Sequence, residues 1–193
     1  ERLRAKYRLP GEFILAVGHL EARKNYVRLI QAVAELRRSG KEISLVIVGN
    51  DGGARAEIRA ETARLGLANQ VTILEGVSDQ ELQSLYALCA LVAFPSFYEG
   101  FGIPLLEAMA ARRPLVLSDT PVFRELTEGR GAYFPPDDSG AIAAAIARIL
   151  DSPECQQELV AYGIERIRAF DFARLAGQVE QLYRRLQPET SEA

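Results

Sequence analysis

Short apolar runs alternate with amphipathic stretches along most of the chain. The apolar runs occupy residues 13–18, 43–49, 71–76, 90–95, 114–119 and 131–136. The continuous branched apolar run at 43–49 is typical of a central parallel strand covered on both faces. The stretches between the runs place apolar residues at helical spacing, as in the segment from Asn25 to Ser39. This alternation predicts an α/β fold, a Rossmann-like parallel sheet with right-handed crossovers and helices on both faces.

Several polar residues mark where the predicted helices begin. Asn25 is a candidate N-cap for the first long helix, Asp138 for an alanine-rich helix that ends at about Leu150, and Ser78 with Glu81 forms a capping box. The prolines of the last apolar run, 131–136, suit an edge strand, because an edge tolerates a missing backbone N–H.

We expect a single domain over residues 1–193. Residues 1–10 resemble the tail of a helix or a linker, and 188–193 a disordered tail. A terminal helix within 171–187 carries more apolar surface than a helix facing water needs, so something should cover its stripe of Phe172, Leu175, Val179, Leu182, Tyr183 and Leu186. The chain opens without Met and in helical character, as a fragment of a longer protein would.

Composition narrows the class of protein. Hydrophobic residues make up 48% of the 193 residues and charged residues 25%, which excludes wholesale disorder. The net charge of −3 argues against a nucleic-acid surface. Cys89 and Cys155 are far apart and lack ligand spacing, so we interpret them as packing residues of a reduced protein and expect no metal site. No apolar run reaches a membrane span of about 20 residues, and the charged N-terminus is no signal peptide. We therefore expect a soluble, cytoplasmic protein.

Residues 96–109, SFYEGFGIPLLEAM, gather the strongest candidate chemistry at a strand-to-helix junction. Gly100 and Gly102 allow a sharp turn, and Pro104 suits the first helical position, so the helix start offers free backbone N–H groups to an anion. Glu99 and Glu107 bracket this start, and carboxylates accept hydrogen bonds from hydroxyl groups. A ligand with a central phosphate and hydroxyl groups on either side, such as a nucleotide sugar, fits both features. The alternative is that Glu107 is a solvated helix residue.

The loop after the first predicted strand adds cationic candidates. Lys24 is one of three lysines in a chain whose other basic side chains are nearly all arginines. A compact ammonium suits a point contact with phosphate. Arg23 and His19, the single histidine, are weaker candidates in the same loop. The alternatives are a solvated cation for Lys24 and a packed or hydrogen-bonded side chain for His19.

The loop after the first predicted strand argues against binding of NAD. A dinucleotide fold carries GxGxxG after its first strand, whereas this chain has GHLEARKN there. The later GNDGG turn is only a weak match to a phosphate-binding glycine loop.

The stretch EGFGIPLLE, Glu99 to Glu107, resembles the Glu-x7-Glu motif of retaining GT-B glycosyltransferases of family 4, and GHLEARKN resembles the phosphate-binding loop of the same family. The likeness extends from about Lys6 to Leu186 and implies the C-terminal, donor-binding half of such an enzyme. It implies that Glu99 binds the donor sugar, Glu107 the ribose and Lys24 the diphosphate. The remaining substrate-binding positions that it implies are Arg23, His19, Gly100, Phe101, Gly102 and Ile103, with the amides of Phe101 and Gly102 on the diphosphate or sugar, and Gly76, Val77 and Ser78 near the nucleobase.

The resemblance has one departure and several consequences. Many members carry Arg where this chain has His19, and Arg23 is the candidate replacement. The implied activity is sugar transfer from a nucleotide diphosphate sugar to a saccharide or lipid-linked acceptor, similar to mannosyltransferases of polysaccharide or glycolipid synthesis, without a cofactor or metal. The resemblance implies an acceptor-binding N-terminal half as a partner. Through that half the protein would associate peripherally with the inner face of the membrane. By itself this half would be inactive. The alternatives are a non-catalytic nucleotide or sugar-phosphate binding module, or a sugar epimerase with acid/base residues elsewhere.

Overall fold

The computed structural model describes residues 2–186, without the side chains of 172, 173 and 175. Its sheet has six parallel strands in the order β3-β2-β1-β4-β5-β6. The strands are β1 (Phe13–Val17), β2 (Ser44–Val48), β3 (Val71–Leu74), β4 (Leu91–Phe94), β5 (Leu115–Ser118) and β6 (Ala132–Phe134). The predicted Rossmann-like parallel sheet is therefore confirmed, with β6 at the edge where its neighbouring prolines can be accommodated.

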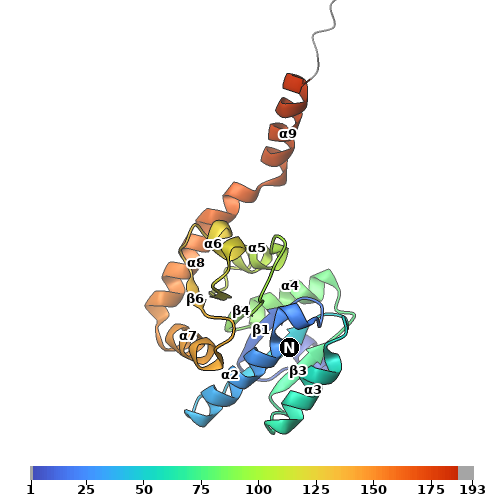
Figure 1. Cartoon of the computed structure of the whole chain (residues 1–193), viewed down its shortest axis with the longest axis vertical. Helices are drawn as coiled ribbons and strands as arrows, with labels where there is room; N and C mark the ends of the chain where they lie inside the picture. Colours follow the sequence, from blue (N-terminus) through green and yellow to red (C-terminus); the bar gives the residue numbers. More distant parts are fainter. Residues whose placement is uncertain (1, 187–193) are drawn as a thin grey trace, which may run out of the picture.

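Helices cover both faces of this sheet (Figure 1). One face carries α2 (Tyr26–Arg38), α3 (Arg55–Arg64) and α7 (Ser139–Asp151), and the other carries α4 (Asp79–Leu88), α5 (Ile103–Ala110) and α6 (Pro121–Leu126). The remaining helical segments are α1 (Arg2–Tyr7), η1 (Ala22–Lys24), α8 (Pro153–Ile167), η2 (Arg168–Phe170) and α9 (Phe172–Leu186).

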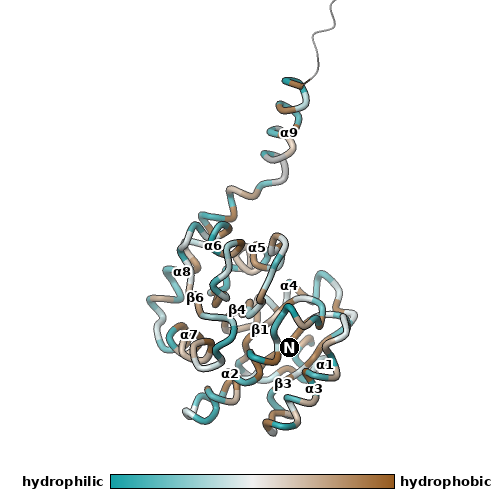
Figure 2. The backbone as a smooth tube through the Cα atoms, viewed as in Figure 1, coloured by the Kyte–Doolittle hydropathy of each residue, from teal (hydrophilic) through white to brown (hydrophobic). Residues whose placement is uncertain are grey.

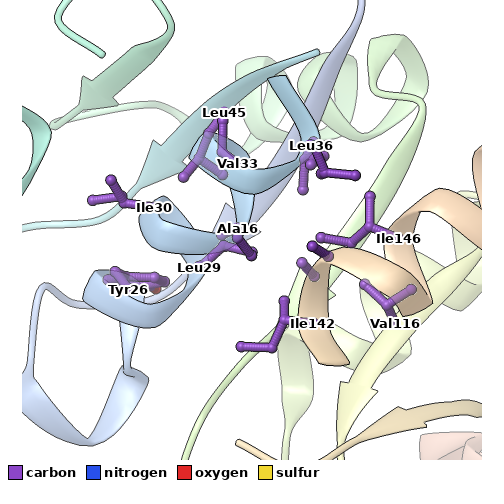
Figure 3. Close-up of a cluster of buried hydrophobic side chains, with 14 of the residues drawn as sticks. Ala16, Tyr26, Leu29, Ile30, Val33, Leu36, Leu45, Val116, Ile142 and Ile146 are labelled. Atoms are coloured by element: carbon purple, nitrogen blue, oxygen red, sulfur yellow. The ribbon is translucent and has the colours of Figure 1, made fainter. Parts of the chain in front are cut away.

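The strands are mostly apolar because helices cover both faces of the sheet; the polar exceptions are Ser44, Thr72, Ser118 and Tyr133. In β1, Ile14 and Ala16 belong to one buried cluster, while Phe13, Leu15 and Val17 belong to the other. Figure 3 shows the first cluster, in which Leu29 and Val33 of α2 and Ile142 and Ile146 of α7 gather around Ala16, Leu45 and Val116 of the sheet. Burial of a Leu, Ile or Val side chain contributes about 1.5–3 kcal/mol, and burial of the smaller Ala16 contributes less.

Helix α8 packs against both helical layers. Cys155 and Leu159, in its first half, pack on the cluster shared by α2 and α7, whereas Ile167, at its end, packs on the cluster of the opposite face. Gly163 lets α8 approach α5 closely, because a Cβ there would lie 3.3 Å from Met109 Cγ. This helix delivers the chain from one layer to the other, beside α5.

Two of the three predicted N-caps are confirmed, and one is wrong. Ala141 N–H donates to Asp138 Oδ1 at 2.9 Å, and Ser78 and Glu81 form the expected capping box. Asn25 makes no side-chain cap bond; it adopts a left-handed conformation and its amide donates to Pro95 O at 3.0 Å and Pro136 O at 2.6 Å. Two carbonyl oxygens on neighbouring loops attract this side chain away from its own helix.

The helix start predicted at Pro104 also differs in detail. The helix α5 begins one residue earlier, at Ile103, so Pro104 is its second residue. Of the two glycines expected to turn the loop, Gly102 has a positive φ of 92° and Gly100 does not. The turn that aims the helix is therefore made at Gly102.

The last helix, α9, extends away from the sheet and its covering helices (Figure 1). Apolar and polar residues alternate along it (Figure 2), and Val179, Leu182, Tyr183 and Leu186 are between 42% and 69% exposed. The predicted apolar surface is thus present for these four residues; the side chains of Phe172 and Leu175, and the tail 188–193, lie outside what the structure describes.

The loops after β1 and β2 touch backbone to backbone. A Cβ on Gly49 would lie 1.9 Å from Gly18 O, and Gly18 N–H donates to Val48 O at 2.9 Å. We expect Gly49→Ala to lower the free energy of unfolding by about 3 kcal/mol or more, because backbone has to move. Gly11→Ala, where a Cβ meets nothing within 4 Å, is the control and should stay within about 0.5 kcal/mol. Urea unfolding measures both, and equal stability of the two variants would contradict this contact.

Candidate functional site

The candidate site lies where the sheet reverses its strand order. β1 and β4 are neighbours, but the chain leaves β1 toward α2 on one face and leaves β4 toward α5 on the other. In open α/β sheets this divergence opens a crevice at the carboxyl ends of the strands, where ligands bind. Both predicted candidate segments, the loop after β1 and the 96–109 stretch, occupy this position.

Lys24 is held under the loop after β1. Gly18 has a φ of 143°, and a Cβ there would lie 2.7 Å from Lys24 Cε and 2.9 Å from its Nζ. A glycine is therefore required for the lysine to fold back against the strand end. Tyr26 donates its hydroxyl to Gly18 O at 3.0 Å and fixes this turn from the other side. Burial, and next the charge of Glu99, raises the pKa of Tyr26, so its hydroxyl stays protonated as a donor.

Glu99 joins the two candidate segments. Its Oε1 accepts from Lys24 Nζ at 2.7 Å and from Ser96 Oγ at 2.6 Å, and its Oε2 accepts from Arg23 at 3.2 Å. Glu99 and Lys24 are each only 6% exposed. The alternative of a solvated lysine is therefore wrong: Lys24 is a buried partner of Glu99.

Backbone and amide bonds fix the same junction. Phe97 N–H donates to Arg23 O at 2.9 Å, and the Asn25 amide bonds described above reach Pro95 and Pro136. Ser118 Oγ donates to Ser96 O at 2.6 Å, which ties the β4 loop to the end of β5. These bonds connect the ends of β1, β4 and β5 and the segment after β6, so the charged groups stand on a rigid base.

A hollow of about 370 Å³ opens above this base. Five of the predicted residues line it: His19, Arg23, Lys24, Gly76 and Val77. Seven further residues line it: Val17, Gly18, Val48, Gly49, Asn50, Leu74 and Pro104. Sequence reasoning named Pro104 for its place at the helix start and did not predict the other six as site residues. The hollow is within the size range of ligand pockets. His19 is exposed there, so it is a side chain of the crevice rather than of the core.

The first turn of α5 faces this hollow through Pro104. Leu105 N–H donates to Gly102 O at 2.9 Å and closes the turn, so the preceding amides belong to the part of a helix that offers N–H groups to an anion. Gly102 is fixed by its neighbours, since a Cβ there would lie 3.1 Å from Leu126. The side chains of Phe101 and Ile103 point elsewhere: both line an apolar groove of about 720 Å³ with Phe170.

Glu107 is exposed on α5 and anchored by one oxygen. Tyr86 of α4 donates its hydroxyl to Glu107 Oε2 at 3.0 Å and lies 3.2 Å from Pro104 O. Burial, and next the charge of Glu107, raises the pKa of Tyr86 and keeps it protonated. Glu107 lines a separate hollow of about 550 Å³ beside Tyr86. Sequence reasoning missed Tyr86, although a tyrosine on the buried face of a helix needs a partner for its hydroxyl.

The other predicted residues have more local tasks. Ser78 N–H and Oγ both donate to Glu81 Oε2, at 3.2 and 3.0 Å, so Ser78 is committed to capping α4. Gly76 has a φ of 61°, and its N–H donates to Asn50 Oδ1 at 3.4 Å, which links the loops after β2 and β3. Gly100 is exposed.

Within residues 2–186 the structure groups no three His, Cys, Asp or Glu side chains that could hold a metal ion. Cys89 and Cys155 are both free, and burial raises the pKa of Cys89 to about 12, which suits a packing role. Among the described helices, none is long and apolar enough to cross a membrane.

Comparison with known proteins identifies the family. The sequence model described as "Glycosyl transferases group 1" matches residues 1–166. The chain belongs to the group 1 glycosyl transferases. The resemblance drawn from EGFGIPLLE and GHLEARKN is thereby confirmed at the level of the family.

Relatives in this family include several bacterial sugar transferases. The chain is 38% identical over 160 residues to the alpha-D-kanosaminyltransferase of Streptomyces kanamyceticus, covering 81% of this chain and 41% of that protein. It is 34% identical over 181 residues to the serotype-specific mannosyltransferase WbdA of Escherichia coli, covering 91% and 22%, and 31% identical over 183 residues to a phosphatidyl-myo-inositol mannosyltransferase of Mycobacterium leprae, covering 93% and 48%. The chain thus spans less than half of each of these relatives.

Solved structures share the fold. Sucrose-phosphate synthase from Thermosynechococcus elongatus superposes with a TM-score of 0.83 at 32% identity, covering 95% of this chain and 48% of that chain. Anabaena HepE, in complex with UDP, gives 0.83 at 24% identity, covering 96% and 52%. The C-terminal domain of the group 1 family protein LpcC from Francisella tularensis gives 0.73 at 20% identity and covers 87% and 90%. The chain therefore has the fold of the C-terminal domain of a GT-B glycosyltransferase.

The buried ion pair predicts a measurable cost for losing the lysine. We expect Lys24→Ala to lower the free energy of unfolding by about 3 kcal/mol, because Glu99 stays buried with only Arg23 to balance it. The double variant Lys24→Ala/Glu99→Gln should recover part of this loss. Urea unfolding of the single and double variants measures the coupling, with Lys41→Ala, whose side chain pairs at the surface with Asp151, as the control. A Lys24→Ala protein as stable as Lys41→Ala would show that the pair contributes little.

Proposed function

We propose that this chain is the donor-binding half of a retaining glycosyltransferase. It binds a nucleotide diphosphate sugar in the crevice between the carboxyl ends of β1 and β4. The observation that carries the proposal is the hollow of about 370 Å³ lined by His19, Arg23 and Lys24 beside the start of α5. Two cations and a helix N-terminus at one opening suit a diphosphate. The UDP complex of the similarly folded HepE supports a nucleotide ligand.

The proposed chemistry of this half is electrostatic. In a retaining transfer the bond between the sugar C1 and the diphosphate oxygen breaks, and a bond from C1 to the acceptor oxygen forms on the same face. By family resemblance, the acceptor proton passes to an oxygen of the departing diphosphate. Lys24, Arg23 and the amides before α5 stabilise the negative charge that grows on that group. Glu99 orients the sugar, and no metal or cofactor is required by this scheme.

Glu107 is proposed to bind the ribose. Tyr86 occupies one side of its carboxylate and leaves the other oxygen, Oε1, for ribose hydroxyls. Gly76 and Val77, which line the hollow at the ends of β2 and β3, lie on the side where the nucleobase would sit. Ser78, held in its capping bonds, contributes through its position in this loop.

The sugar and acceptor are proposed from the relatives. Mannosyltransferases recur among them, which supports a mannosyltransferase-like enzyme acting on a polysaccharide or glycolipid acceptor. Since the chain spans less than half of these relatives, we assign sugar transfer to a protein that also carries an acceptor-binding half, and donor binding alone to this chain. The exposed apolar residues of α9 are proposed to dock on that other half.

The ribose assignment predicts a selective effect. We expect Glu107→Gln to weaken binding of a nucleoside diphosphate by about 1–3 kcal/mol, because a charge-assisted pair of hydrogen bonds is lost. Binding of inorganic pyrophosphate, which has no ribose, should change little. Calorimetry with UDP, GDP, ADP and pyrophosphate, with EDTA present, measures this, and Glu158→Gln on the exposed face of α8 is the control. Unchanged nucleoside diphosphate affinity would return Glu107 to a solvated role.

Helix α9 gives a second prediction. Its exposed apolar residues make few contacts with the rest of the domain, so its amides should exchange with solvent far faster than those of β2. Hydrogen exchange followed by mass spectrometry on the isolated chain resolves the two segments. Equal protection of α9 and β2 would show that α9 is stabilised within this chain and would remove the support for docking.

A further inference from the structure

We propose that Glu99 makes the site prefer the nucleotide sugar over the nucleoside diphosphate that remains after transfer. This inference rests on the proposed function, because it takes the diphosphate to bind beside Lys24. In this inference the Glu99 carboxylate repels the bare diphosphate and accepts a hydrogen bond from a hydroxyl group of the donor sugar.

The positive charge that the site offers to a phosphate is reduced by neighbouring carboxylates. Lys24 and Arg23 supply two positive charges, but both contact Glu99, at 2.7 and 3.2 Å. Arg23 also contacts Glu21, with Nε 2.5 Å from Oε2. The cations are therefore already partly neutralised before any phosphate arrives.

The Lys24 side chain has little freedom to move. Lys24 is 6% exposed and lies against Gly18, so it cannot swing far from Glu99 to meet a ligand. A phosphate oxygen bonded to Lys24 Nζ at about 2.8 Å would place two negative groups on one ammonium, within roughly 5 Å of each other. Repulsion at that distance in a partly buried site is large enough to change affinity about ten-fold.

The Glu99 carboxylate can accept one further hydrogen bond. A carboxylate offers roughly four acceptor positions. Lys24, Ser96 and Arg23 occupy three of those on Glu99. About one acceptor position remains, and a sugar hydroxyl can fill it by donating a hydrogen bond. A bare diphosphate has no such hydroxyl and meets only the repulsion.

The Glu99 carboxylate thus discriminates between the nucleotide sugar and the nucleoside diphosphate. The donor offsets the repulsion through its sugar, whereas the product loses that contact once the sugar has gone to the acceptor. Glu99 then favours release of the nucleoside diphosphate.

The test is calorimetry on wild type and Glu99→Gln with UDP and GDP, each paired with UDP-glucose or GDP-mannose. We expect Glu99→Gln to bind the nucleoside diphosphate about ten-fold more tightly, and to lose the preference for the nucleotide sugar. The ratio of the two affinities is the decisive readout, because a merely structural loss would change both ligands alike.

Glu21→Gln is the matched control, since it removes an equal charge from Arg23 while leaving Glu99 in place. Its nucleoside diphosphate affinity should stay within about two-fold of wild type, because the Glu21 carboxylate pairs with Arg23, whereas Lys24 Nζ pairs with Glu99. Tightening equal to that of Glu99→Gln would reduce the effect to net charge and overturn the inference.

Two further outcomes separate this inference from the proposed function. If wild type binds both ligands and Glu99→Gln weakens both to the same degree, Glu99 only positions Lys24, and the inference fails while the donor site stands. If wild type binds neither ligand, the proposed function itself fails. Should Glu99→Gln not fold, Glu99→Asp retains the charge: we expect nucleoside diphosphate affinity within about two-fold of wild type and a reduced sugar preference, and tightening would contradict the role of charge.

Discussion

The contact between Lys24 and Glu99 holds together the two halves of the sheet at the point where they diverge. One residue follows β1 and the other follows β4, and both are buried. Burial of an ion pair costs solvation free energy, which is offset only when both charged groups keep their hydrogen-bond partners. Ser96 and Arg23 satisfy the carboxylate, while Gly18 gives the lysine room to lie under its loop. The positions of Lys24, Arg23 and Glu99 depend on this arrangement, whereas Tyr86 anchors Glu107 separately.

The apolar framework explains why such a polar cluster can be tolerated. Most strand residues are buried, and the helices of the two layers leave a crevice at the carboxyl ends of the strands. Close backbone approaches, such as Gly49 against Gly18 O, bring the loops of adjacent strands together around that crevice. The charged residues thus occupy the one part of the sheet where strand ends, helix starts and water meet.

Family membership and local geometry contribute different parts of the functional picture. The match to group 1 glycosyl transferases fixes the class of protein, and the C-terminal GT-B fold accounts for the sheet order. The geometry adds what the family match does not specify for this chain: a lysine already paired, a glutamate anchored by Tyr86, and His19 exposed in the crevice. These features bear on affinity and selectivity rather than on the class of reaction.

The sequence by itself determined the order of strands and helices, because continuous apolar runs and helical spacing report burial directly. Ser78 with Glu81 and the Asp138 cap were predictable for the same reason, since their bonds lie within a few residues. Only the tertiary structure decided the partners of Asn25, which bonds to Pro95 and Pro136 rather than to its own helix. It likewise buried Lys24 against a glutamate 75 residues away and placed Tyr86 under Glu107. Contacts between distant segments depend on which loops the sheet order brings together, and no local pattern encodes that.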